Sequence, residues 1–197
     1  MQMIKIVRSF LEFVTSNMFC FLLSTKSNIK LGKNVRFKKI PHIQIEGSAK
    51  LYIGNNVMIN SDNRNYHFNM HSRCKIMADR SNAVIRIDDN CRIHGTCIHA
   101  FELISIGKNC LIAANTQIMD GNAHDLSFTS VENRIYTRGT SKPIVIEDNV
   151  WIGANVIILP GVTIGKGSVI SAGSVVHKSI PAMVVAGGNP IHIIKEF

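Results

Sequence analysis

Residues 146–181 read as six consecutive units of six residues: IEDNVW, IGANVI, ILPGVT, IGKGSV, ISAGSV and VHKSIP. An aliphatic residue opens each unit, and a small or β-branched residue usually follows four places later. The opening residues are Ile146, Ile152, Ile158, Ile164, Ile170 and Val176. A period of six fits neither a helix, with about 3.6 residues per turn, nor a simple strand, so the stretch predicts a solenoid of short strands and turns.

This array resembles the hexapeptide-repeat acyltransferases. The resemblance implies an all-β fold, a left-handed parallel β-helix in which the chain winds a triangular prism with one hexapeptide on each face. The inward aliphatic residues then stack in columns, with neighbouring coils about 4.8 Å apart. The general rule for parallel crossovers favours the opposite hand, so left-handedness rests on the resemblance alone.

Three segments follow from the pattern. An amphipathic helix is expected within residues 1–30, a β-helix over 31–181 and a short tail over 182–197 that could end in a helix. Residues 60–73 are polar and aromatic and interrupt the repeat. Residues 124–143 contain no hexapeptide, and such a long excursion from a tight solenoid is typically functional. His99 falls where an inward aliphatic residue is due, so we expect it in the core or in a bulge.

The N-terminal helix is expected over Met3–Leu23. Its polar residues lie on one side: Lys5, Arg8, Ser9, Glu12, Thr15 and Ser16. Three charges in the first twelve residues argue against a membrane-spanning helix. Two interpretations stay open, packing on the prism or a trimer partner and an interfacial membrane anchor. A signal peptide is not excluded, although no small-residue cleavage site follows Leu23.

The composition indicates one domain with an anionic partner. The chain has 197 residues, 46% of them apolar, and a net charge of +9. Residues 1–50 contain nine Lys or Arg against two acids, which suits a phosphorylated cofactor, an acidic glycan or a membrane surface. No nucleic-acid motif is present, so that partner is not expected. Cys91, Cys97 and Cys110 fall at small inward positions, which favours a reducing cytoplasm over disulfides or metal binding.

A second resemblance concerns the site. The order Asp-Gly-Asn-x-His at 120–124, a long loop, VWIGAN from Val150 and LPGVTIG from Leu159 is similar to the acetyl-CoA-dependent sugar O-acetyltransferases. That branch includes galactoside, maltose, nodulation and surface-polysaccharide enzymes. The resemblance is strong over residues 106–195. It implies a homotrimer with sites between adjacent subunits, direct transfer in a ternary complex and His124 as the general base.

The chemistry agrees with that role. A sugar hydroxyl is a poor nucleophile at neutral pH, and a neutral imidazole can remove its proton as it attacks a thioester. A backbone N–H can stabilise the tetrahedral oxyanion. By resemblance, that donor lies near Gly153 and Ala154 of the neighbouring chain.

The remaining site residues follow from the same resemblance. Ala154 and Ala172 are eighteen residues apart and leave a groove for the pantetheine of acetyl-CoA. Trp151 points outward where acceptor and thioester would meet. Candidate partners for the cofactor phosphates are Lys166, Lys178, His192 and Lys195. Asp120 and Asn122 would bind acceptor hydroxyls, and Asp120 could equally orient His124.

Three alternatives remain open. The enzyme could acetylate an amino sugar, or the prism could be a non-catalytic scaffold. A zinc hydratase would need His94, His99 and His124 as ligands, but their spacing matches no zinc signature and no metal is expected. The basic end and the apolar helix favour a polysaccharide or lipid-linked acceptor and a cytoplasmic protein, peripheral on the inner face of the membrane.

Overall fold

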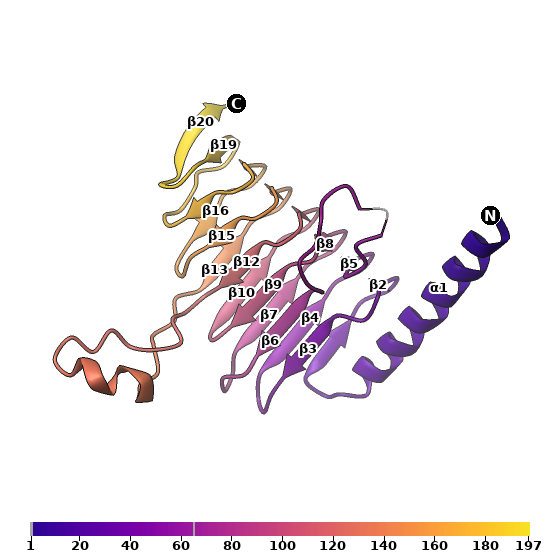
Figure 1. Ribbon diagram of the computed structural model, residues 1–197, viewed down its shortest axis with the longest axis horizontal. Coiled ribbons are helices and arrows are strands. Elements are labelled where there is room, and N and C mark those ends of the chain that lie inside the picture. Colours follow the sequence, from indigo (N-terminus) through magenta and orange to yellow (C-terminus); the bar gives the residue numbers. More distant parts are fainter. Residues whose placement is uncertain (1, 65) are drawn as a thin grey trace.

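The computed structural model describes residues 2–64 and 66–197. The side chains of Gln2, Ile4 and Lys5 lie outside the described residues, and with them the predicted positions of Ile4 and Lys5 on the first helix. One α-helix, α1 (Gln2–Ser24), precedes a coil of short strands that continues to the C-terminal end (Figure 1). The helix and the solenoid expected from the sequence are both present.

Three sheets form the sides of a prism, and each turn of the chain adds a strand to each sheet. Sheet A contains β1 (Ile29–Leu31), β4 (Lys50–Ile53), β7 (Val84–Ile87), β10 (Leu103–Ile106), β13 (Ile144–Ile146) and β16 (Thr163–Ile164). Sheet B contains β2 (Arg36–Lys38), β5 (Met58–Asn60), β8 (Arg92–His94), β11 (Leu111–Ile112), β14 (Trp151–Ile152), β17 (Val169–Ile170), β19 (Val184–Gly187) and β20 (His192–Glu196). Sheet C contains β3 (His42–Ile45), β6 (Lys75–Ala78), β9 (Cys97–Ala100), β12 (Gln117–Met119), β15 (Ile157–Ile158) and β18 (Val175–Val176).

The aliphatic positions of the repeat point into the prism. Ile85, Ile104 and Ile144 are register partners on sheet A, and all three are buried. Ile112 and Ile152 are partners on sheet B and are also buried. Burying one such side chain stabilises the fold by about 1.5–3 kcal/mol, so the stacked columns are the main source of stability.

Asparagines build the corner between sheets A and B. Asn56, Asn90, Asn109 and Asn149 adopt the left-handed conformation, with φ between 56° and 63°. Their side-chain amides form a ladder of hydrogen bonds of 3.0–3.1 Å along the prism. Asn tolerates a positive φ better than most residues, which explains its recurrence at this turn.

Helix α1 packs on the first coil through Ser16 and, toward its C-terminal end, through Phe19, Cys20 and Leu23. Ser16 is buried, and its hydroxyl accepts a hydrogen bond of 2.9 Å from the Phe37 backbone N–H. The large apolar residues exposed on this helix are Met3, Ile6, Val7, Phe10, Leu11, Phe13, Val14, Met18, Phe21 and Leu22. By length and composition alone, Ile6–Ser24 could cross a membrane, a test that signal sequences also pass. In this single chain most of the helix's apolar surface is uncovered.

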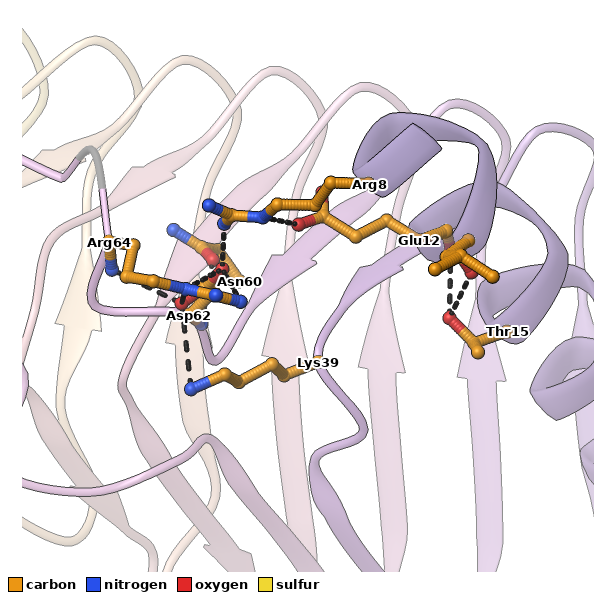
Figure 2. Close-up of polar contacts among 8 residues, drawn as sticks. Arg8, Glu12, Thr15, Lys39, Asn60, Asp62 and Arg64 are labelled. Carbon is orange, nitrogen blue, oxygen red and sulfur yellow. Dashed lines mark hydrogen bonds and ion pairs between the residues drawn. The ribbon is translucent and has the colours of Figure 1, made fainter. Parts of the chain in front are cut away.

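A buried carboxylate ties α1 to the irregular segment 60–73 (Figure 2). Asp62 accepts hydrogen bonds from Arg8 at 2.8 Å and from Arg64 at 3.1 Å, and the Lys39 ammonium lies 3.5 Å away. Arg8 also donates to Glu12 at 2.8 Å. Burial by itself would raise the pKa of Asp62, but the hydrogen bonds from Arg64 and the charges of Arg64 and Lys39 outweigh it and lower the pKa to about 2.

The sequence expectations for His99 and Cys97 are wrong. Ile98 is the inward residue of β9, while Cys97 and His99 on either side are half-buried on the outer face. The His99 Nε2 atom lies 3.1 Å from a carboxylate oxygen of Asp79. The reason is a short corner, because Ile98 follows the inward Ile93 by five residues instead of six. Strict counting in sixes therefore loses the register here.

The end of the chain is also different from the expected tail with a helix. Strand β19 continues sheet B in parallel with β17, and β20 pairs antiparallel with β19. The solenoid thus ends in a hairpin at the edge of sheet B, at the opposite end of the prism from α1 (Figure 1).

Candidate active site

The loop 124–143 leaves the prism between β12 and β13 and extends away from it (Figure 1). Its two ends are joined as a narrow neck. Gly121 and Ser141 form an antiparallel bridge, the Asn122 N–H donates to the Thr140 carbonyl at 3.1 Å, and the Lys142 N–H donates to the Asp120 carbonyl at 2.7 Å. A short 3-10 helix, η1 (Val131–Tyr136), lies within the loop.

Arg80 holds both sides of this neck. Its guanidinium donates to the Gly139 carbonyl at 2.9 Å and to the Asn122 carbonyl at 3.3 Å. The same group lies over the Phe101 ring, 3.7 Å from its centroid. A planar guanidinium is suited to donate in two directions while it stacks on a ring. The sequence analysis missed Arg80, because a single arginine in an irregular turn carries no local signal.

Asp120 occupies a different environment from the one expected. It is fully buried, and its carboxylate accepts backbone hydrogen bonds from Phe101 at 2.6 Å, Glu102 at 2.9 Å and Leu103 at 2.7 Å. With no exposed surface it cannot bind an acceptor hydroxyl or orient His124 directly. Asp120 instead anchors the corner from which the neck begins.

His124 stands at the end of the neck with its side chain exposed to solvent. Within residues 2–64 and 66–197 its imidazole has no hydrogen-bond partner, so both ring nitrogens are accessible. Asn122, two residues earlier, is also exposed. An accessible imidazole on a firmly held neck can accept a proton from a bound molecule, as a general base does.

Four of the predicted site residues meet in one groove. Trp151, Gly153, Ala154 and Ala172 line a groove of about 580 Å³ on sheet B and its corner with sheet C. Gly153 is needed for close packing of successive coils, because a Cβ there would lie 2.6 Å from the Ala172 backbone nitrogen. The Trp151 side chain is 53% exposed, so its ring forms an open wall of the groove.

Of Gly153 and Ala154, the two residues expected to supply the oxyanion donor, only one has a free backbone N–H. The Gly153 N–H already donates to the Ile170 carbonyl at 2.8 Å. The Ala154 N–H has no acceptor among the residues that the structure describes. Of these two residues, only Ala154 therefore has a backbone N–H available to a ligand in the groove.

An aromatic cluster that the sequence analysis did not assign closes one end of the groove. Tyr66 stacks on His94 with ring centroids 4.4 Å apart, and His67 packs on Tyr66 at 4.5 Å. These three rings, Phe68 and Arg92 line the same groove as Trp151. Burial first, then the nearby Lys38, His67 and Arg92 side chains, lower the pKa of His94 to about 4, so His94 is neutral at pH 7. The irregular segment 60–73 and the long loop between β12 and β13 separate Tyr66, His94 and Trp151 in the sequence, so regular spacing could not predict that they line one groove.

The four cationic candidates do not form one cluster. His192 and Lys195 lie on β20, at the C-terminal edge of the sheet that carries Trp151. Lys166 follows β16 at the corner between sheets A and B. Lys178 follows β18 at the corner between sheets C and A, so within one chain it is far from sheet B.

His124 and the groove also occupy different sides of the prism. The loop leaves at the corner between sheets C and A, and sheet B is the side opposite that corner. A reaction that uses both must therefore combine His124 of one chain with the groove of another.

No three His, Cys, Asp or Glu side chains in the described residues are arranged to hold a metal ion. His94 lies on sheet B, His99 is bonded to Asp79 on sheet C, and His124 is at the neck. These three histidines do not form a zinc site within the chain.

Known proteins with similar sequences are transferases built from hexapeptide repeats. The model of the bacterial transferase hexapeptide (six repeats) matches residues 143–178, and that of the hexapeptide repeat of succinyl-transferase matches 84–119. Galactoside O-acetyltransferase of Escherichia coli is 45% identical over 95 residues, which cover 47% of this chain and 44% of that protein.

Solved structures similar to this chain also include hexapeptide-repeat and sugar acetyltransferases. A hexapeptide-repeat acetyltransferase of Vibrio cholerae is 39% identical, with a TM-score of 0.52 over 57% of this chain and 62% of that one. A galactoside acetyltransferase in complex with coenzyme A is 30% identical, with a TM-score of 0.53 over 84% of this chain and 64% of that one.

The prism with its interrupted repeat is thus a left-handed β-helix, the fold of the hexapeptide-repeat acetyltransferases that it resembles. Over these repeats the chain is similar to hexapeptide-repeat acetyltransferases. It spans about half the length of the first curated relatives that it matches.

Proposed function

We propose that the protein transfers an acetyl group from acetyl-CoA to a hydroxyl of a sugar or surface-polysaccharide precursor, with His124 as the general base. One observation carries the proposal. Trp151, Gly153, Ala154 and Ala172 line one open groove, and all four lie within the residues matched by the transferase hexapeptide model. The galactoside acetyltransferase that resembles this chain binds coenzyme A, which supports the same cofactor here.

The proposed mechanism is direct transfer. The His124 imidazole accepts the hydroxyl proton as the sugar oxygen attacks the thioester carbonyl carbon. The Ala154 N–H stabilises the oxyanion of the tetrahedral intermediate. When the intermediate collapses, the carbon–sulfur bond breaks, and the imidazolium returns its proton to the leaving thiolate. General-base catalysis of this kind typically contributes about 10²–10⁴-fold to the rate.

The assembly that we infer is a homotrimer with sites between adjacent subunits. His124 and the groove lie on opposite sides of one prism, so a second copy has to supply one of them. Closed rings of identical chains satisfy this requirement for every subunit at once.

The cofactor would lie along sheet B toward the C-terminal hairpin. Pantetheine would occupy the floor formed by Ala154 and Ala172, with its phosphates near His192 and Lys195 of β20. We also propose that the exposed apolar side of α1 makes the protein peripheral to the cytoplasmic face of a membrane.

The test is release of free thiol from acetyl-CoA with a panel of sugars, comparing the parent with His124→Ala. We expect kcat to fall by about 10²–10⁴-fold. His177→Ala is the matched control, because His177 is also an exposed histidine of the prism, and its activity should stay within about twofold of the parent. Undiminished turnover by His124→Ala would show that His124 is not the general base. A parent protein that binds no acyl-CoA would favour the non-catalytic scaffold.

The product distinguishes the two enzymatic alternatives. An O-acetyl ester is cleaved by mild hydroxylamine, whereas the amide made by an amino-sugar N-acetyltransferase resists it. Loss of the acetyl group on this treatment is the expected result.

A further inference from the structure

Three cations with no carboxylate partner share the outer face of sheet B near α1. Arg36, Met58 and Arg92 are register partners on β2, β5 and β8. Lys38 lies two residues beyond Arg36 and therefore points to the same side of its strand. The residue between them, Phe37, is buried in the core. The fold thus directs Arg36, Lys38 and Arg92 outward together.

These side chains line one pocket of about 390 Å³. Among the described residues no Asp or Glu lines it, and none of the three cations has an ion-pair partner. Asp62, just beyond β5, is buried and already bonded to Arg8 and Arg64. The pocket therefore keeps its positive charge. The lowered pKa of His94, caused first by burial and then in part by Lys38 and Arg92, is consistent with this positive charge.

The cationic pocket opens onto the proposed active-site groove. Arg92 lines both, and on the groove side its neighbours include Tyr66, His94 and Trp151. The groove is also free of Asp and Glu among its described lining residues. A ligand that spans both would place an anion on Arg36, Lys38 and Arg92 and an uncharged ring against the aromatic side chains.

We propose that Arg36, Lys38 and Arg92 form an anion subsite that binds the phosphate or diphosphate of the acyl acceptor, so the acceptor is a phosphate-linked sugar and not a free one. This inference rests on the proposed acetyl transfer for its biological meaning. Two arginine guanidinium groups and an ammonium match the geometry and charge of phosphate oxygens.

The subsite lies at the end of the groove that remains for the acceptor. The cofactor floor at Ala154 and Ala172 and the cations of β20 lie toward the C-terminal edge of sheet B, whereas β2, β5 and β8 lie toward its N-terminal edge. Helix α1 packs against β1 and β2, so its exposed apolar surface is next to the strand that carries Arg36 and Lys38. A lipid diphosphate at a membrane and a soluble nucleotide diphosphate offer the same anion to these side chains.

The experiment uses the full chain and its single tryptophan, Trp151, as a fluorescent reporter. Inorganic pyrophosphate is titrated into the parent, into Arg36→Gln/Arg92→Gln and into Arg86→Gln, an exposed arginine of β7 on sheet A. Calorimetry repeats each titration independently of the reporter. We expect the double variant to bind pyrophosphate at least tenfold more weakly, the control to match the parent, and affinity to fall as salt increases.

Two results would overturn the subsite: equal pyrophosphate affinity in the parent and the double variant, or an equal loss of CoA affinity, which would assign the cations to the cofactor. Melting temperatures of the variants check that each is folded. UDP in solution and farnesyl diphosphate in phosphatidylcholine vesicles distinguish the two sources of the diphosphate. Thiol release from acetyl-CoA with diphosphate-linked sugars as acceptors is measured in parallel. If it is absent while pyrophosphate binding depends on Arg36 and Arg92, the acetyltransferase proposal fails and the subsite stands.

Discussion

Arg80 donates a hydrogen bond of 2.9 Å to the carbonyl oxygen of Gly139 and so joins the turn after β6 to the far end of the loop that carries His124. Arg80→Ala should loosen the neck. We expect kcat for thiol release to fall by about tenfold or more because His124 is no longer held for attack. The KM for acetyl-CoA should stay within about twofold, since the groove lies on sheet B.

The control for this prediction is Arg86→Ala on sheet A, which should leave both constants unchanged. Arg80→Lys should restore activity only in part, because one ammonium cannot reproduce the stacked guanidinium with two directed donors. A rise in the KM for acetyl-CoA with kcat unchanged would contradict the positioning role.

Asp120 is predicted to be a structural residue. Asp120→Ala leaves three backbone N–H groups without their acceptor, the one of Phe101 fully buried, which should lower the free energy of unfolding by about 3 kcal/mol. Asn122→Ala, at an exposed side chain, should change it by less than about 0.5 kcal/mol. Urea unfolding followed by circular dichroism measures both. Equal stability of the two variants would show that the Asp120 network is dispensable.

The Asp62 cluster should make stability depend on pH in the acid range. The folded pKa of Asp62 is about 2, below its ordinary value of 3.8, so its contribution is complete above pH 3.8 and is lost as pH falls toward 2. The size corresponds to about 2 kcal/mol. The difference in unfolding free energy between the parent and Asp62→Asn should therefore shrink between pH 5 and pH 2. A constant difference over this range would contradict the assignment.

The exposed apolar side of α1 should bind membranes. In flotation with anionic vesicles we expect the parent to rise with the lipid and Phe10→Glu/Phe21→Glu to remain below, because both phenylalanines are exposed. Phe197→Glu, which changes an exposed phenylalanine at the other end of the prism, is the matched control. Equal recovery of all three proteins in the soluble fraction would show that α1 serves another purpose, such as contact with a second copy.

Local patterns predicted much of the fold. The hexapeptide period placed the buried columns, because a residue six places on takes the equivalent inward position on the next face, and one eighteen places on stacks on the same column. The same period failed at Ile93–Ile98, where one corner is a residue short, and therefore misplaced Cys97 and His99. The C-terminal strands were missed because an antiparallel hairpin at a sheet edge does not follow the repeat.

The candidate site likewise contains residues that the repeat predicted and residues that it could not predict. Trp151, Ala154 and Ala172 lie within unbroken repeats, so counting eighteen residues per coil was enough to bring them together. Arg80, Arg92 and Tyr66 could not be found in this way. Their neighbours in space are up to about ninety residues away in the sequence, beyond irregular segments that break the count.

By itself, then, the sequence determined the prism, its interruption before His124 and the groove residues, because these depend on regular spacing along the chain. Only the tertiary structure decided that Asp120 is a buried anchor and that α1 exposes its apolar side. It alone also decided that three cations meet near the N-terminal end of sheet B, in a pocket that shares Arg92 with the groove. Those properties depend on which coils stack and where the irregular segments return, and no local pattern encodes such long-range contacts.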